Sequence, residues 1–301
     1  MGRALYDVSP AAHAVFDAAD AALGEAFSRL MFDGPLEDLT QTANAQPAIL
    51  TASIAALAAL REAHPGLPAP RFAAGHSLGE YSALVAAGVL ELAAAVRLVR
   101  LRGEAMQRAV PPGLGAMAAM VGGDAAAVED LCQEVRTALG DERVLSPANF
   151  NAPGQIVIAG HADAVALASE RASTRRLKAI ALKVSAPFHC ALMAPAAEVL
   201  DRALGDVHFA PFQFPVVSNV EASPNEDASR VRGLLVRQVA GAVRWQESLE
   251  WMAGQGITVA LEIGPGRVLA GLARKAAPNL VVRPVFEPAE VSAAWVTSPT
   301  T

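Results

Sequence analysis

The sequence predicts an α/β protein in which a small ferredoxin-like unit is inserted into a larger core. The 301 residues are 53% hydrophobic and 18% charged, which is typical of a globular chain with a sizeable interior. A G-x-S-x-G pattern at residues 75–79 joins a short apolar segment to a helical one, as in a strand-to-helix turn. Between residues 114 and 185 the hydrophobic periodicity gives the element order βαββαβ.

Helical periodicity dominates the first part of the chain. A stripe that runs from Val15 through Ala19 to Phe27 predicts an amphipathic helix. A second helical segment is apolar nearly all round, which indicates burial, and the proline-rich stretch 65–70 ends it. The expected elements are helices over 10–30, 47–63, 78–87 and 90–106, and a strand over 71–75.

Strands and helices alternate in the rest of the chain. Strands are expected over 116–121, 144–149, 155–159 and 177–184, with helices over 124–139 and 162–173. The chain then returns to helices over 189–204, 228–241 and 245–255, with strands over 216–218 and 258–263. The tail, 291–301, is rich in Ser, Thr, Pro and Ala and is expected to be disordered.

Charge and cysteine usage exclude several classes of function. The formal net charge is −6 and no run of Lys or Arg offers a nucleic-acid surface. Cys132 and Cys190 have neither metal-ligand spacing nor the pattern of a disulfide framework, which favours a reducing, cytoplasmic setting. The N-terminus has charges but no apolar stretch behind them, so we expect that it is not a signal peptide, and the longest apolar run, 47–60, is too short to cross a bilayer. We therefore expect a cytoplasmic protein without a metal, membrane or nucleic-acid partner.

The G-x-S-x-G pattern predicts a nucleophilic serine, Ser77, on a strained elbow. Small residues at positions 75 and 79 avoid collisions with the neighbouring strand and helix, and the turn exposes Oγ. The next backbone N–H, that of Leu78, would point at the developing oxyanion. A simpler interpretation is an S-x-x-E capping box formed by Ser77 and Glu80. His76 points away from its neighbour on a tight turn, so we expect a packed or hydrogen-bonded residue rather than a base.

Five segments in the same order carry a family resemblance. They are AGHSLGEYSALVAAGVLELAAAVRLVRLRGEAMQ (74–107), PGLGAMAAMVG (112–122), SPANFNAPGQIVIAGH (146–161), SAPFHCALM (185–193) and LEIGPGRVLAGL (261–272). With these motifs the chain resembles the malonyl-CoA:acyl-carrier-protein transacylases of bacterial fatty-acid synthesis over about residues 10–285. The resemblance implies an α/β-hydrolase-like core with a parallel sheet at 1–113 and 186–290, and a ferredoxin-like subdomain at 114–185.

The resemblance also implies the chemistry. Ser77 would take malonyl from coenzyme A, and the phosphopantetheine thiol of an acyl carrier protein would then collect it in a ping-pong cycle. His189 matches the family's catalytic base, and the backbone carbonyl of Gln238 matches the group that orients it, so that a dyad suffices. No cofactor is implied, the partners are malonyl-CoA and the carrier protein, and the chain is expected to be a monomer.

Further side chains match the acyl-binding part of the family site. Arg102 matches the arginine that grips the malonyl carboxylate with two parallel hydrogen bonds, which would make acetyl a poor substrate. Gln46 matches a supporting glutamine. Asn149 and Asn151 match a polar loop that lines the cleft, although turn chemistry also explains them. Phe188 matches a bulky residue that would crowd an α-methyl substituent, and thus disfavour methylmalonyl.

The resemblance breaks at the start of the chain. The family opens with a central apolar strand and a Gly-Gln-Gly-Ser-Gln loop, whose first glutamine supplies a second oxyanion donor, and this sequence contains neither. The expectation is that Met1 is an internal methionine of a longer protein. Two alternatives to the transferase stay open: an acyl hydrolase on the same fold, and an inactive carrier-binding remnant. The sequence does not distinguish fatty-acid from polyketide synthesis.

Overall fold

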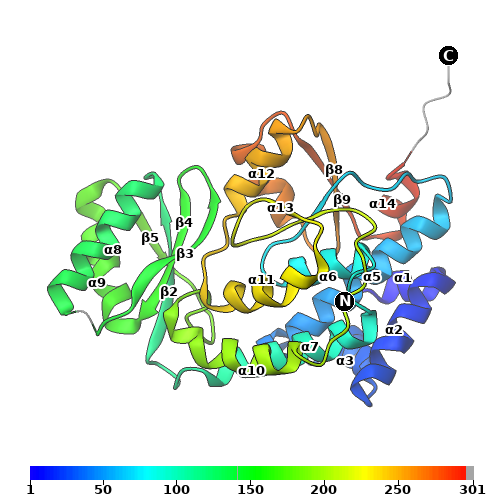
Figure 1. Ribbon diagram of the computed structural model, residues 1–301, viewed down its shortest axis with the longest axis horizontal. Coiled ribbons are helices and arrows are strands. Elements are labelled where there is room, and N and C mark those ends of the chain that lie inside the picture. Colours follow the sequence, from blue (N-terminus) through cyan, green and yellow to red (C-terminus); the bar gives the residue numbers. More distant parts are fainter. Residues whose placement is uncertain (141, 296–301) are drawn as a thin grey trace.

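The computed structural model describes residues 1–140 and 142–295 and has the predicted α/β architecture. Two parts lie side by side in Figure 1. A four-stranded sheet with two helices forms the smaller part. The larger part is mostly helical and surrounds five short strands.

Five helices open the chain. The predicted helix 10–30 is interrupted, because Gly24 adopts a left-handed conformation with φ of 67°. The buried face of α2 (Pro10–Leu23) is made of Ala12, Phe16 and Ala19, whereas Val15 of the predicted stripe is only half-buried and Phe27 is buried in the next helix. The bounds are α1 Arg3–Val8, α2 Pro10–Leu23, α3 Phe27–Asp33, α4 Leu36–Thr40 and α5 Thr42–Ala63.

Helix α5 is the central helix of the larger part. It begins five residues before the predicted start and carries Pro47 inside its first turns. Of the described helices, only α5 is long and apolar enough to span a bilayer by length and composition. However, 61% of its apolar window is buried inside the protein, as is typical of a core helix.

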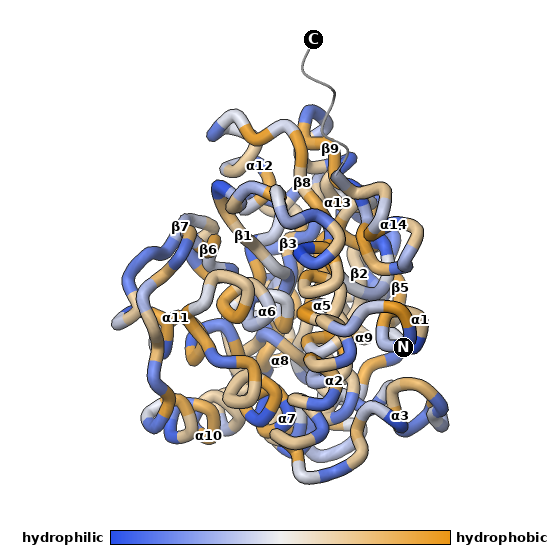
Figure 2. Tube along the Cα trace, turned by 90° about the vertical axis from the view of Figure 1, so that its right-hand side faces the viewer, coloured by the Kyte–Doolittle hydropathy of each residue, from blue (hydrophilic) through white to orange (hydrophobic). Residues whose placement is uncertain are grey.

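The core strands form two separate groups. One sheet has the order β1-β6-β7, in which β1 and β6 are parallel, and the other is the parallel pair β8-β9. In Figure 2, β1 lies between the β6–β7 hairpin and the β8–β9 pair. The bounds are β1 Ala73–Ala74, α6 Leu78–Ala86, α7 Leu92–Arg108, α10 Ala194–Leu204, β6 Val216–Val217, β7 Pro224–Asn225, α11 Ala228–Ala240, α12 Trp245–Gly254, β8 Val259–Ile263, α13 Val268–Ala276, β9 Val281–Val285 and α14 Pro288–Ala293.

The smaller part has the strand order expected of a ferredoxin-like unit. Its antiparallel sheet runs β3-β4-β2-β5, and β2 and β4 pair over seven consecutive residues from Gly115–His161 to Val121–Gln155. Helices α8 and α9 pack on this sheet around Leu131 and Ile158, which are fully buried. The bounds are β2 Gly115–Val121, α8 Ala125–Leu139, β3 Leu145–Ala152, β4 Gln155–His161, α9 Ala162–Ala172 and β5 Lys178–Ala181.

Two predicted segments differ from the structure. The helix expected from residue 189 begins at Ala194, because His189 has a φ of 60° and a 3₁₀ turn, Ala191–Met193, comes first. The tail is not disordered at its start: Pro288 opens α14, Glu287 and Glu290 form a capping box, and Val291 is buried. Residues 296–301 of the predicted tail lie outside the described residues.

A groove separates the two groups of core strands. It has a volume of about 1230 Å³ and reaches Ala73 and Ala74 of β1 on one side and the whole of β8 on the other. Side chains of α5 (Ile49, Leu57) and of α12 (Leu249) also line it. In the described sheets β1 pairs only with β6, and β8 only with β9, so each has one unpaired edge.

Candidate active site

The predicted elbow is present between β1 and α6. Ser77 has φ of 50° and ψ of −103°, a conformation that costs on the order of 1–3 kcal/mol for a residue with a side chain. Gly75 is sterically required, because a Cβ there would lie 2.0 Å from the carbonyl carbon of Gly79. The same argument was wrong for Gly79, where a Cβ would meet no atom within 4 Å. Gly79 borders the groove, which removes the expected collision.

Ser77 and His189 lie within hydrogen-bonding distance. Ser77 Oγ is 2.8 Å from His189 Nε2, and His189 Nδ1 is 2.8 Å from the backbone carbonyl oxygen of Gln238. Since a carbonyl only accepts, Nδ1 carries the proton and Nε2 is free to accept the proton of the serine. Burial and, to a smaller extent, the charge of Arg102 lower the pKa of His189 to about 3. The imidazole is therefore neutral at physiological pH and able to act as a base.

Arg102 brings a buried positive charge to the same place. Its side chain donates to Gln46 Oε1 at 2.6 Å, to Ser77 Oγ at 2.9 Å and to Gln238 Oε1 at 3.0 Å. Gly103 permits this arrangement, because a Cβ there would lie 2.6 Å from the carbonyl oxygen at the start of α5.

No carboxylate of the described residues contacts the guanidinium of Arg102, and the carboxyl group whose charge acts on it is that of the buried Glu80. Only 2% of the residue is exposed, its Nε has no hydrogen-bond partner, and it forms no ion pair in the part of the chain that the structure describes. Burial lowers its pKa. A buried guanidinium bound only to neutral oxygens is a receptor for an anion, because a carboxylate would compensate its desolvation.

The other predicted residues lie at different distances from the dyad. Gln46 contacts Arg102 directly. Asn151 is 2.8 Å from His76 Nε2, which confirms His76 as a hydrogen-bonded elbow residue. Asn149 is buried in β3, where its backbone bridges to Val243. These asparagines form no hydrogen bond with Ser77 or His189.

Phe188 precedes the histidine and packs against two apolar clusters. One cluster belongs to the core and contains Leu98, and the other includes Met117 of β2. Its ring therefore bridges the two parts of the molecule next to the candidate base.

The N-terminus of α6 offers one oxyanion donor. The backbone N–H of Leu78 has no acceptor among the described residues, whereas the N–H of Ser77 donates to Asn219 Oδ1 at 2.7 Å. Leu78 is also the first residue of α6, so its N–H lies at the positive end of the helix dipole. It is thus available for an oxygen that develops negative charge.

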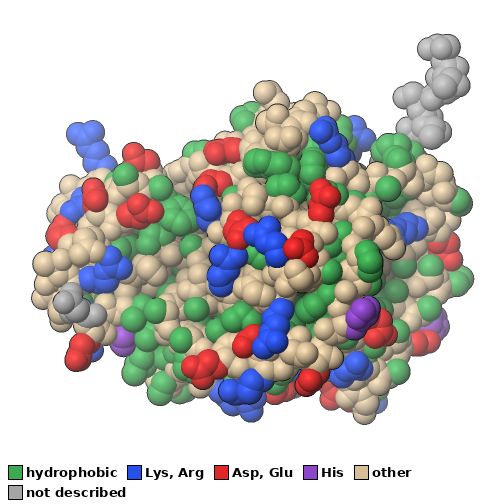
Figure 3. All heavy atoms as spheres, viewed as in Figure 1, with side chains coloured by type: hydrophobic (Ala, Val, Ile, Leu, Met, Phe, Trp, Pro, Cys, Tyr) green, Lys and Arg blue, Asp and Glu red, His purple; other side chains and the backbone are tan. Residues whose placement is uncertain are grey.

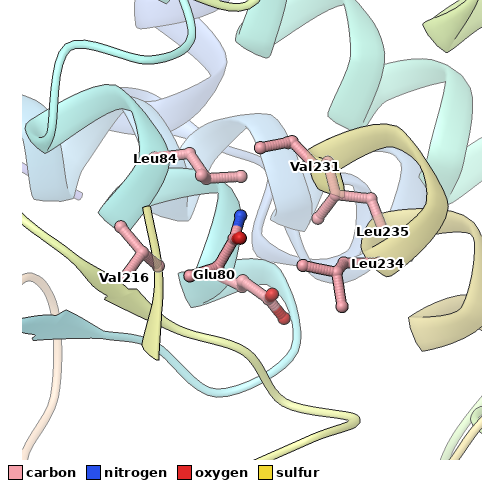
Figure 4. Close-up of a pocket in the computed structure, with 7 residues that line it drawn as sticks. Glu80, Leu84, Val216, Val231, Leu234 and Leu235 are labelled. Atoms are coloured by element: carbon pink, nitrogen blue, oxygen red, sulfur yellow. The ribbon is translucent and has the colours of Figure 1, made fainter. Parts of the chain in front are cut away.

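The capping-box interpretation of Ser77 and Glu80 was wrong. The Ser77 side chain makes no cap bond. Glu80 instead accepts from Gln238 Nε2 at 2.6 Å and from the backbone N–H of Asn219 at 3.2 Å. Burial raises its pKa to about 7. Glu80 also lines a small pocket whose apolar walls come from α6, β6 and α11 (Figure 4).

Three groups of the site were not predicted as parts of it: Glu80, Asn219 and the side chain of Gln238. Glu80 directly follows the G-x-S-x-G motif, and this position was interpreted as part of a helix cap. Asn219 is 142 residues away from Ser77 in sequence. The one sequence signal for Asn219 is the polar pair Ser218-Asn219, which follows a short apolar strand.

The structure offers no evident metal site. Across residues 1–140 and 142–295, no group of three or more His, Cys, Asp or Glu side chains could hold a metal ion. Cys132 and Cys190 are free and buried, and burial raises the pKa of both thiols.

Comparisons with known proteins place these features in a family. Residues 1–285 match the family model described as acyl transferase domain. The malonyl CoA-acyl carrier protein transacylase of Escherichia coli O157:H7 is 46% identical over 286 residues, which are 95% of this chain and 91% of that protein.

Solved structures agree over nearly the whole chain. An acyl carrier protein S-malonyltransferase from Vibrio cholerae superposes with a TM-score of 0.94 at 41% identity, covering 98% of this chain and 95% of that one. A malonyl-transacylase solved in complex with its type II PKS acyl-carrier protein gives a TM-score of 0.92 at 43% identity, with coverages of 98% and 94%.

Proposed function

The chain belongs to the acyl transferase domain family, and from this premise we propose that it transfers malonyl from malonyl-CoA to the phosphopantetheine thiol of an acyl carrier protein. The observation that carries the proposal is the contact between a Ser–His pair and a buried arginine that contacts no carboxylate among the described residues. Ser77 Oγ lies within hydrogen-bonding distance of both His189 and Arg102. A nucleophile and an anion receptor so close together suit an acyl group that ends in a carboxylate.

In the first half-reaction, Ser77 becomes malonylated. Oγ attacks the thioester carbonyl while His189 Nε2 takes its proton, and the developing oxyanion is held by the Leu78 N–H. The C–S bond then breaks, and His189 returns the proton to the departing coenzyme A thiol. In the second half-reaction the carrier thiol gives its proton to His189 and attacks the ester, which regenerates Ser77. These steps balance without a cofactor.

Arg102 accounts for the choice of acyl group. The malonyl carboxylate would replace the neutral oxygens that Arg102 now contacts, and would compensate its buried charge. An acetyl group offers no such compensation, so the charge would stay desolvated and unpaired. We assign supporting roles to Gln46, which holds the guanidinium, and to Phe188, which would crowd an α-methyl substituent.

The expected partner is a carrier protein in a reducing cytoplasm, in keeping with two free thiols. On the face shown in Figure 3, basic and acidic side chains are interspersed. Arg230 and Arg237 of α11 both pair with Glu221. This face therefore offers no broad basic surface to the partner.

Acyl hydrolysis is the second candidate function. The groove is lined by Leu78 and Gly79 on either side of the elbow's last peptide, so water held in it would be near an acyl group on Ser77.

One experiment distinguishes the two. Purified protein is incubated with malonyl-CoA and a holo carrier protein, and the products are resolved by mass spectrometry, with acetyl-CoA as the control donor. Malonylated carrier as the main product, with little acetyl transfer, supports the transferase. Free malonate at the same rate with and without carrier would contradict it and favour the hydrolase.

A further inference from the structure

The elbow is held by one buried asparagine that spans it. Asn219 is 1% exposed and follows β6. Its Oδ1 accepts from the Ser77 N–H at 2.7 Å, and its Nδ2 donates to the Gly75 carbonyl at 2.8 Å. A single side-chain amide thus ties the residues on either side of His76, across the turn whose Ser77 φ is 50°.

Glu80 joins this asparagine to the element that orients the histidine. Its Oε2 accepts from the Asn219 backbone and from Gln238 Nε2. The same Nε2 lies 2.9 Å from the Ser77 carbonyl oxygen, and the Gln238 backbone carbonyl accepts from His189 Nδ1. A continuous chain of hydrogen bonds therefore runs from the backbone of the nucleophile to the backbone that holds the base.

The backbone alone supplies little of this support. β1 and β6 are each two residues long and form two residue pairs. Glu80 is 3% exposed and forms no ion pair among the described residues, so its main restraints are the hydrogen bonds to Asn219 and Gln238. A buried polar group that is fully engaged fixes the geometry of its partners, and costs much when one partner is removed.

We propose that Asn219 and Glu80 are positioning residues that fix Ser77 and His189 relative to each other. Neither touches the reacting atoms. They act through the Ser77 backbone and through Gln238, so their loss displaces the nucleophile from the base, while the hydrogen bond from Arg102 to Gln46 still holds the guanidinium. This inference rests on the proposed function only in the identity of the acyl group, since it concerns the reactivity of Ser77 itself.

The test separates the reactivity of Ser77 from malonyl transfer. A neutral alkyl fluorophosphonate labels an activated serine: Oγ bonds to phosphorus, fluoride leaves, and His189 takes the proton. Labelling rates are measured by intact mass for wild type, Asn219→Ala, Asn219→Asp, Glu80→Ala and Glu80→Gln. Asn225→Ala is the matched control, because Asn225 is a buried asparagine of the same hairpin that bonds to the Asp227 carbonyl and not to the elbow.

We expect Asn219→Ala and Glu80→Ala to label about 10²-fold more slowly, since a displacement of about 1 Å costs this much. Glu80→Gln, which keeps an acceptor, should recover to within about tenfold of wild type. Asn219→Asp keeps the acceptor for Ser77 but loses the donor to Gly75 and should lie between them. In malonyl transfer the same variants should lose kcat with KM changed less than about twofold.

Labelling of folded Asn219→Asp and Glu80→Ala at the wild-type rate would overturn the inference, as would an equal loss in Asn225→Ala. If Asn219→Ala does not fold, the labelling rates of Asn219→Asp and the two Glu80 variants decide the outcome. The Tm of each variant shows whether it is folded. Normal labelling of wild type without malonyl transfer would refute the proposed function and leave this inference standing.

Discussion

The ferredoxin-like sheet and the core strands differ in how their positions are fixed. In the smaller part, β2 and β4 pair over seven residues and fully buried side chains fill one face. In the core, β1 and β6 pair over two residues, and a groove separates β1 from β8. The candidate catalytic groups lie beside these short strands. Backbone ladders therefore hold the smaller part, whereas side-chain hydrogen bonds from Asn219, Glu80 and Gln238 hold the site.

The largest effect is expected from removal of the base. His189→Ala leaves Ser77 without a proton acceptor and should lower the rate of malonyl transfer on the order of 10⁴-fold or more. His208→Ala, an exposed histidine of the core, is the control and should be indistinguishable from wild type. Single-turnover kinetics with malonyl-CoA measure both. A loss of less than tenfold in His189→Ala would show that the base lies elsewhere.

Removal of the anion receptor should have the next largest effect. Arg102→Ala takes away the partner of the malonyl carboxylate, which is worth about 2–5 kcal/mol in a buried pair. We expect kcat/KM for malonyl-CoA to fall about 10³-fold, while acetyl-CoA changes far less. Arg97→Ala, an exposed position on the same helix, should leave both unchanged. Equal losses for malonyl-CoA and acetyl-CoA would contradict the assignment.

Filling the groove should stabilise the core and speed the chemistry. The Leu78 N–H is the oxyanion donor assigned at the elbow, and a second donor is typically worth about 10²- to 10³-fold in rate. We predict that an apolar strand and a Gly-Gln-Gly-Ser-Gln loop, fused ahead of Met1, raise both Tm and the acylation rate. The same fusion with the strand residues changed to Gly and Ser is the control. If Tm and the acylation rate of the fusion do not exceed those of that control, the groove does not accept an added strand.

The pH dependence of stability should report Glu80. Its pKa in the folded protein is about 7, above the ordinary value of 4.5, so the folded state binds more protons between these values. The stabilisation by this group is fully present below pH 4.5 and is lost as pH rises through 7. When pH rises from 5 to 8, the free energy of unfolding measured in urea should therefore fall less in Glu80→Gln than in wild type.

His189 contributes in the opposite direction to that pH dependence. Its pKa is lowered from 6.5 to about 3, so its contribution is present above pH 6.5 and is lost as pH falls. Glu80 and His189 share a hydrogen-bond network, so the decisive interval is pH 6.5 to pH 8, where the His189 contribution is constant and, of the two, only Glu80 still titrates. An identical change between pH 6.5 and pH 8 in the two proteins would contradict the assignment to Glu80.

The smallest effect is expected from a matched pair of core substitutions. Ile158→Val removes a methylene from the fully buried side of the ferredoxin-like sheet and should cost about 1 kcal/mol of unfolding free energy. Ile263→Val, on β8 at the groove, should cost less, because its side chain already borders open space. Equal losses in denaturant unfolding would show that the groove is closed in solution.

Local pattern predicted much of this structure. The elbow, the βαββαβ order and the buried helix α5 follow from turn residues and periodicity. The family motifs gave His189, Arg102 and Gln238, which the structure brings together around Ser77. The pairing of distant segments could not be predicted this way. Glu80 looked like a helix cap because its partner Asn219 is far along the chain, and Gly79 looked constrained because the groove has no sequence signal.

The intact mass of the protein after brief exposure to malonyl-CoA, beside Ser77→Ala, tests the central claim most directly. Ser173→Ala, in the short 3₁₀ turn after α9, serves as the matched control. We predict a gain of one malonyl group in wild type and in Ser173→Ala and none in Ser77→Ala. A folded wild-type protein that gains no malonyl group, or a Ser77→Ala variant that gains one, would contradict the account.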